Sequence, residues 1–112
     1  MTHSSDDGER SAFLFTHLVA MFETLALQQL GKLVSPITGK VERDLRQARI
    51  TIDMLVMIRE KTAGNLLPEE QRIVNAVLTE LQMNYLDESN RTHEGAAGDS
   101  GEEAGAEENI ED

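Results

Sequence analysis

The sequence predicts an all-α protein, built as a three-helix module with a disordered acidic tail at its C-terminus. Apolar residues recur at helical spacing in three stretches, at about residues 11–33, 44–62 and 68–86. Turn-forming residues separate the stretches, with Pro36 and Gly39 in the first gap and Gly64 and Pro68 around the second. A length of 112 residues allows one small domain.

The first predicted helix, about residues 11–33, is unusually apolar around its axis. Ser11 stands where an N-cap is expected, and Gly31 loosens the end. An amphipathic helix in a globular protein needs an apolar stripe of somewhat more than about 100°. Here two apolar surfaces are present, so the helix carries more apolar surface than one face of a small bundle can cover. They contain Leu14, Phe15, Leu18, Val19, Met21, Phe22, Leu25, Ala26 and Leu30 on one side, and Phe13, Ala20 and Leu27 on another.

The second predicted helix, about residues 44–62, repeats this excess. One apolar face is suited to the core and contains Leu45, Ala48, Ile52, Leu55 and Val56. A second set lies nearly opposite and contains Ile50, Met54, Met57 and Ile58. A monomer of this size would leave the second face exposed, which predicts an interface.

The stretch "EKTAGNLLPEEQ", residues 60–71, predicts the end of one helix and the start of the next. Gly64 suits the left-handed residue past a helix C-terminus, and Pro68 suits the first position of a helix. Leu67 has no side-chain oxygen for the N-cap, which a local turn at Asn65 could replace. The third helix, about residues 68–86, places Ile73, Val74, Val77, Leu78, Leu81 and Tyr85 on one face.

The net charge of −11 belongs to the two ends of the chain. Residues 1–10 carry −2, residues 87–112 carry −9, and residues 11–86 are neutral. We therefore predict a disordered N-terminus (1–10), a helical domain (11–86) and a disordered acidic tail (87–112), because the tail lacks the apolar groups that offset ordering. Without a basic stripe to neutralise phosphates, we expect no binding to nucleic acid.

The sequence favours a cytoplasmic protein. There is no cysteine, which is compatible with a reducing compartment, and the first ten residues carry acids where an export signal needs positive charge. The apolar run Ala12–Leu30 contains His17, Glu23 and two glutamines, and an acid near the middle of a span costs about 2.5–3.5 kcal/mol on insertion scales. We expect no integral membrane association and read this run as the buried helix of a soluble protein.

Three segments together resemble a bacterial family of small helical proteins catalogued as domain of unknown function 1844. They are "FTHLVAMFETLALQQLG" (15–31), "ARITIDMLVMIREKTAGNL" (48–66) and "LPEEQRIVNAVLTELQMNYL" (67–86). The family often has Thr or Ser where this chain has Leu67. The resemblance implies helical structure and a bacterial, cytoplasmic setting. It implies neither an activity nor any catalytic residue.

Four polar residues on the first two helices form a hypothetical cluster: His17, Glu23, Arg49 and Asp53. His17 and Glu23 are about 120° apart on a helical wheel, which does not make a metal site. Arg49 and Asp53 are four apart, a spacing typical of a structural ion pair. No phosphate loop, catalytic dyad or nucleophile motif is recognisable, so we predict no catalytic residue, metal or cofactor.

Two hypotheses of function follow, beside a third option, peripheral membrane attachment through the first helix. In the first, the protein is a non-enzymatic, self-associating interaction or scaffold module that forms a homodimer or higher oligomer and can engage a protein partner. Its interface would contain Leu14, Leu18, Phe22, Leu25, Ile50, Met54 and Met57. In the second, the protein is an enzyme or binds a small molecule in a pocket between helices at the oligomer interface, and the four polar residues contact the ligand.

Overall fold

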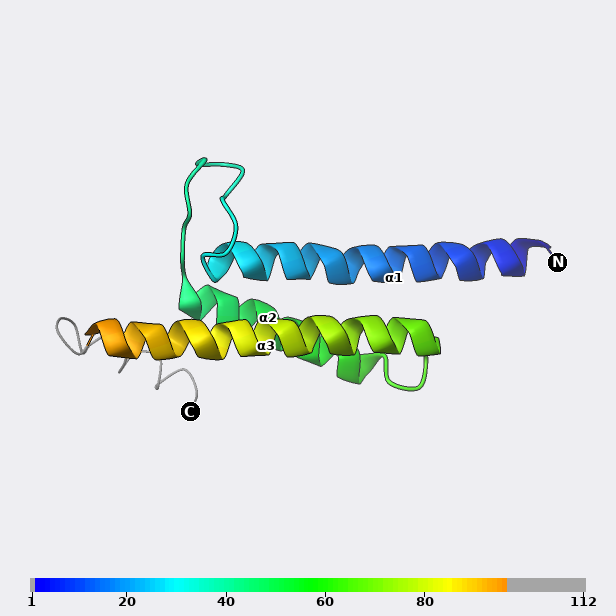
Figure 1. Ribbon diagram of the computed structural model, residues 1–112. Coiled ribbons are helices and arrows are strands. Elements are labelled where there is room, and N and C mark those ends of the chain that lie inside the picture. Colours follow the sequence, from blue (N-terminus) through cyan, green and yellow to red (C-terminus); the bar gives the residue numbers. More distant parts are fainter. Residues whose placement is uncertain (1, 97–112) are drawn as a thin grey trace.

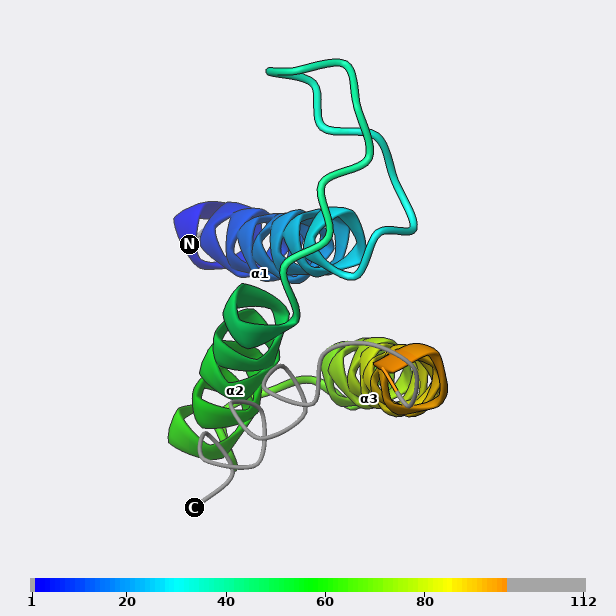
Figure 2. The same cartoon turned by 90° about the vertical axis from the view of Figure 1, so that its left-hand side faces the viewer.

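A computed structural model describes the backbone of residues 2–96 and the side chains of residues 7–91. This part of the chain forms three helices, α1 (Thr2–Gln29), α2 (Leu45–Lys61) and α3 (Pro68–Ala96), which confirms the predicted all-α fold. α1 and α3 run in the same direction, and α2 runs back across them (Figures 1 and 2). Residues 97–112 of the predicted tail lie outside the described residues.

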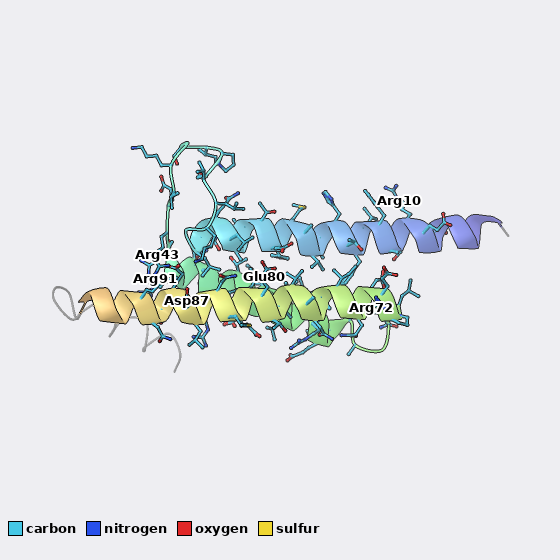
Figure 3. All side chains as sticks on the ribbon, in the orientation of Figure 1. Arg10, Arg43, Arg72, Glu80, Asp87 and Arg91 are labelled. Carbon is cyan, nitrogen blue, oxygen red and sulfur yellow. The ribbon has the colours of Figure 1, made fainter. Side chains whose placement is uncertain are left out.

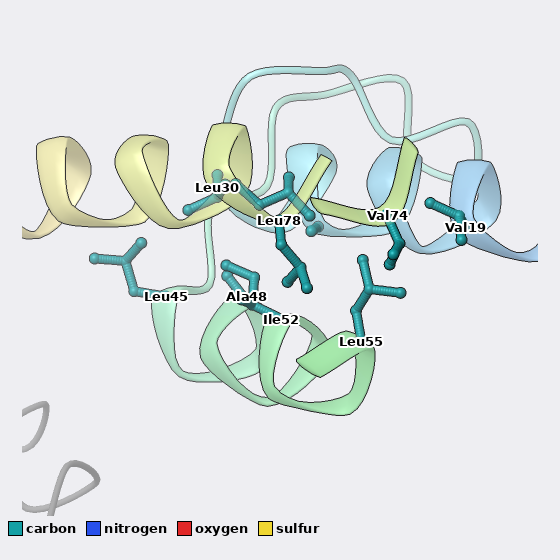
Figure 4. Close-up of a cluster of buried hydrophobic side chains, with 10 residues drawn as sticks. Val19, Leu30, Leu45, Ala48, Ile52, Leu55, Val74 and Leu78 are labelled. Atoms are coloured by element: carbon teal, nitrogen blue, oxygen red, sulfur yellow. The ribbon is translucent and has the colours of Figure 1, made fainter. Parts of the chain in front are cut away.

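The core lies where all three helices meet (Figure 4). Each helix contributes the apolar face that its spacing predicted, except that α1 contributes far less than its composition suggested. The buried residues are Val19, Ala26 and Leu30 of α1, Leu45, Ala48, Ile52 and Leu55 of α2, and Val74, Leu78 and Leu81 of α3. Removing a large side chain from such a site, as in Leu55→Ala, typically costs about 2–5 kcal/mol.

Both ends of α1 differ from the prediction. The helix begins at Thr2, so Ser11 lies inside it and is not the N-cap. Adding residues to an existing helix costs little compared with nucleating one, and residues 2–10 contain no proline. The helix ends at Gln29, before Leu33, because Gly31 adopts a φ of 81°. The amide of Gly31 then donates to the Gln28 carbonyl and that of Lys32 to the Leu27 carbonyl, a Schellman ending.

Residues 30–44 form a loop that stands out from the bundle on the side away from α2 and α3 (Figure 2). An isolated antiparallel bridge joins Val34 to Val41, and the Ser35 amide donates to the Lys40 carbonyl at 2.8 Å. At the tip, Ile37 is 91% exposed. The loop closes where the Asp44 amide donates to the Gln29 carbonyl at 2.7 Å.

The turn between α2 and α3 has the predicted helix-ending and helix-starting residues. Gly64 has a φ of 86°, and Pro68 opens α3. The poor cap at Leu67 is offset by Glu70 and not by Asn65, because the Leu67 amide donates to a Glu70 carboxylate oxygen at 2.8 Å. This is half of a capping box, made with a glutamate that is itself buried.

α3 continues to Ala96, ten residues past its predicted end at Leu86. The added residues belong to the segment predicted as a disordered tail. Tertiary contacts of Glu88, described below, tie this part of α3 to the rest of the molecule.

Candidate functional site

One side of α1 exposes a row of large apolar side chains. Leu14, Leu18, Met21 and Leu25 are each between 38% and 57% exposed. They follow one another at intervals of four, three and four residues, so they share one line along the helix. The row ends one turn before Gln29, whose side-chain oxygen accepts a 2.6 Å hydrogen bond from Thr51 of α2.

α2 exposes a matching set beside the same contact. Met54 lies one turn after Thr51, and Ile50 and Met57 are its neighbours at four and three residues. All three are between 37% and 46% exposed. The two sets therefore lie on the two helices that this hydrogen bond joins. We call them together the apolar face: Leu14, Leu18, Met21, Leu25, Ile50, Met54 and Met57.

Phe22, the remaining residue of the predicted interface, is not part of this surface. It is half-buried and packs against the core cluster. The prediction grouped it with the exposed row because it lies four residues after Leu18 and three before Leu25, on a helix that is apolar on most sides. The other six predicted interface residues belong to the apolar face.

By length and composition, α1 is the one helix in the described residues that is long and apolar enough to cross a membrane. The segment is Asp7–Gln29, with a mean hydropathy of 1.3, and only 11% of its most apolar window is buried. The reading of this run as a buried helix was therefore wrong. One helix of this kind does not establish a span, and Glu23 lies within it, six residues before its end.

Of the four residues in the hypothetical polar cluster, Arg49 and Asp53 do meet. Their side chains form an ion pair with an Nε–Oδ2 distance of 3.4 Å. The Arg49 guanidinium also lies 6.0 Å from the centroid of the Tyr85 ring, which suits a cation–π contact. Together with Ile52, Gln82 and Leu86, these residues line an open pocket of about 330 Å³ between α2 and α3.

His17 and Glu23 lie elsewhere. The exposed His17 ring stacks on Phe13, with centroids 6.0 Å apart and an interplanar angle of 15°. Glu23 is half-buried and faces Glu80 of α3. Burial raises the pKa of Glu23, and a hydrogen bond with Glu80 and the negative charge of Glu80 raise it further. The four residues therefore do not converge on one cavity.

The most developed polar site was not predicted. The carboxylate of Glu88, 6% exposed, accepts from Lys32 Nζ at 2.7 Å and from Arg91 Nη1 at 2.9 Å. Arg43 pairs with it through Nε at 3.2 Å and also donates to the Glu88 carbonyl at 3.1 Å. Figure 3 shows Arg43 and Arg91 close together where the loop meets α3. We call these four residues the Glu88 cluster.

The Glu88 cluster joins three parts of the chain: the start of the loop, its end, and the last turns of α3. Burial alone would raise the pKa of Glu88. The hydrogen bond from Lys32, together with the charges of Lys32, Arg91 and Arg43, outweighs burial and lowers that pKa below its ordinary value. A carboxylate held ionised in this way is suited to a structural role and not to general base catalysis.

The fold and these sites define a small three-helix protein whose most prominent surface is apolar. Within the described residues, no group of three or more His, Cys, Asp or Glu side chains could hold a metal ion. The chain belongs to the family Domain of unknown function (DUF1844), whose model matches residues 12–87. Neither the curated proteins nor the solved structures contain a match to it.

Proposed function

We propose that this protein is a non-enzymatic, self-associating interaction module of the cytoplasm, which assembles through the apolar face. The observation that carries the proposal is the number of large apolar side chains that the face leaves exposed on two neighbouring helices, since a large exposed apolar surface usually marks an interface. A second copy is a simple occupant, because two identical apolar patches can bury each other around a two-fold axis.

The size of the core supports the same conclusion. The domain is near the length at which a lone core supplies about 3–5 kcal/mol. Ten buried apolar residues form that core, while seven large ones stay exposed on the apolar face. Covering them in an oligomer adds apolar burial at about 25 cal/mol per Å² before the cost of association.

The test is the solution mass of the full chain by light scattering, measured over a range of protein concentrations. We expect a dimer or larger species. Met54→Glu, on the apolar face, should shift it to monomer, because a charge would be buried in the interface. Met83→Glu is the matched control, since Met83 is 66% exposed on α3 outside the face and should leave the mass unchanged.

A second matched pair guards against a folding defect in one variant. Leu25→Glu lies on the apolar face, and Leu86→Glu, at another exposed leucine, does not. Circular dichroism should report the same helicity for all four variants. A wild-type chain that stays monomeric at every concentration overturns self-association and redirects the search to a heterologous protein partner.

The pocket between α2 and α3 supports one alternative, a small-molecule-binding protein. Arg49 supplies a cation, and Asp53 and Gln82 supply acceptors, around about 330 Å³. A panel of metabolites tested by thermal shift should then contain a compound that stabilises the wild type and not Arg49→Ala. Absence of any stabilisation across the panel removes this alternative.

We also propose that the apolar face meets protein and not lipid. Glu23 would have to enter the hydrocarbon if α1 spanned a bilayer, and in this fold it is turned toward Glu80 of α3. Co-sedimentation with neutral and anionic vesicles tests the point. We expect the protein to stay in the supernatant in both cases, and binding to either would contradict the proposal.

A further inference from the structure

The exposed row on α1 has the spacing of a helix-pairing seam. Leu14, Leu18, Met21 and Leu25 alternate by four, three and four residues, which is the a/d pattern of a two-stranded coiled coil. Ser11 precedes the row by three residues and Gln28 follows it by three, so polar side chains stand at both ends of the pattern. A seam of this length fits one partner helix laid along α1.

The charges beside the two ends of α1 differ in sign. Near the N-terminus, Asp7 and Glu9 outnumber Arg10, and all three are exposed. After the C-terminus, the loop of residues 30–44 carries three basic and two acidic side chains. The basic residues are Lys32, Lys40 and Arg43, of which Lys32 and Arg43 also pair with Glu88. A parallel pair of α1 helices would place like charges beside each other, which is unfavourable. An antiparallel pair would place opposite charges beside each other, which is favourable.

The N-terminal part of α1 also projects past the start of α3, where the rest of the bundle does not cover it (Figure 1). A parallel pair would set Asp7 and Glu9 against the same residues of the second copy and align the two helix dipoles unfavourably. An antiparallel pair would lay this projecting segment beside the loop of the second copy, where the basic residues and the exposed Leu33 and Val34 lie.

We propose that two copies of this chain pair antiparallel through α1, with the two-fold axis passing between residues 19 and 20. Leu14 then packs against Leu25 of the second copy, and Leu18 against its Met21. The projecting N-terminal segment contacts the loop of residues 30–44 in the second copy, and Ile50, Met54 and Met57 close one side of the seam. The orientation rests on the self-association proposed above and adds the pairing of residues to it.

Cysteine cross-linking tests the orientation cleanly, because the chain has no cysteine of its own. In the antiparallel pair, residue 14 of one copy lies at the same height along the axis as residue 25 of the other copy. Residue 14 of one copy and residue 14 of the other are about 16 Å apart along the axis, which is eleven residues at about 1.5 Å each, and the same holds for residue 25. A disulfide requires Cα atoms within about 7 Å. Full-length Leu14→Cys and Leu25→Cys, each alone, should not cross-link, and an equimolar mixture should form the mixed disulfide.

Mass spectrometry identifies the products, and light scattering under reducing conditions shows whether each variant still self-associates. Should Leu14→Cys or Leu25→Cys lose association, Ser11→Cys and Gln28→Cys provide a second pair. Those positions meet in the same register, and their substitution removes no apolar side chain. The expected product is again the mixed disulfide alone.

The outcomes separate the two proposals. Efficient disulfides in the single variants mean a parallel pair, which overturns the orientation and leaves self-association intact. A self-associating protein that cross-links in none of the samples overturns the α1 seam. A wild-type monomer at every concentration overturns both.

Charge reversal gives an independent readout. Asp7→Lys with Glu9→Lys should weaken self-association about 3- to 10-fold at low salt, since exposed ion pairs are individually weak. The difference should shrink in 0.5 M salt, at which exposed charges are largely screened. Glu60→Lys with Glu69→Lys makes the same charge change away from the seam and should have no such effect. Equal effects from both double variants would contradict the proposed contact with the loop.

Discussion

Glu23 and Glu88 are both glutamates shielded from solvent at contacts of α3, and their surroundings are opposite. Glu88 is enclosed by Lys32, Arg43 and Arg91, so its pKa is lowered despite burial. Glu23 faces another carboxylate, Glu80, so burial and its neighbour act together to raise its pKa. Burial of an acid therefore does not by itself decide whether that acid stabilises the fold. The sign of the charges that distant segments place beside the carboxylate decides it.

The two glutamates also take part in different contacts. The contact at Glu88 holds the loop against α3 and is strongest when the carboxylate is ionised. The contact at Glu23 holds α1 against α3 and improves when a proton is present. As the pH falls from 7, the α1–α3 contact should therefore tighten before the loop contact weakens.

The largest expected effect is at Glu88. Glu88→Gln should lower the free energy of unfolding by about 2 kcal/mol at pH 7, because the cations lose a buried partner, with a discount for their partial exposure. Because the folded pKa is lowered, the stabilisation is present above the ordinary value of 4.5 and is lost as the pH falls through the folded pKa. Urea unfolding of both proteins, at one protein concentration and several pH values, measures this.

The control for that experiment is Asp87→Asn, which removes the neighbouring, exposed carboxylate of α3. It should change stability by less than about 0.5 kcal/mol, as surface substitutions usually do. Equal urea midpoints for the wild type and Glu88→Gln would show that the cluster contributes nothing, whatever its geometry.

An intermediate effect is expected at Gly31, which lies against the Glu88 cluster. An added Cβ would stand 3.3 Å from both Cβ and Cδ of Arg43 and push that side chain from Glu88. Gly31→Ala should therefore cost more than the roughly 1–2 kcal/mol of a left-handed alanine. Gly64→Ala is the matched control, because Gly64 also has a positive φ and its Cβ would meet nothing within 4 Å. Equal losses of melting temperature in the two variants, measured by thermal unfolding, would exclude crowding at Arg43.

The smallest effect is expected at Glu23, with the opposite sign. Glu23→Gln should raise stability at pH 7 by less than about 1 kcal/mol, because it removes a charge from beside Glu80. The gain is fully present above the raised folded pKa and disappears below the ordinary value of 4.5, where the wild-type carboxyl is protonated in both states. The same substitution in a Glu80→Gln background should give a smaller gain, which comes from burial alone, and a gain of equal size there would exclude the pairing.

The three helices and the core faces of α2 and α3 could be predicted from sequence because their determinants are local. Gly64 and Pro68 mark a turn by their own backbone preferences, and apolar spacing needs only neighbouring residues. The core face of α1 could not be identified in the same way, because that helix is apolar on several sides. Only its packing against α2 and α3 selects Val19, Ala26 and Leu30 over Leu18 and Met21.

The Glu88 cluster could not be predicted for a related reason. Glu88 stands in a stretch whose composition is that of a disordered segment. Its partners Lys32 and Arg43 are 56 and 45 residues away in the chain. Only the three-residue spacing to Arg91 was a local signal, and such pairs are common on solvated helices. By contrast, the pairing of Arg49 with Asp53 could be predicted from sequence because both residues lie on one helix.

The loop of residues 30–44 returns to its starting point, since the backbones of Gln29 and Asp44 are hydrogen-bonded to each other. Its tip, around Ile37 and Gly39, is held by contacts internal to the loop, and a Cβ at Gly39 would meet nothing within 4 Å. The two ends of the loop would therefore stay in place if residues were inserted at its tip. For an experimenter, this makes the tip a natural position for an inserted epitope or fluorophore that reports on assembly while leaving the helices as they are.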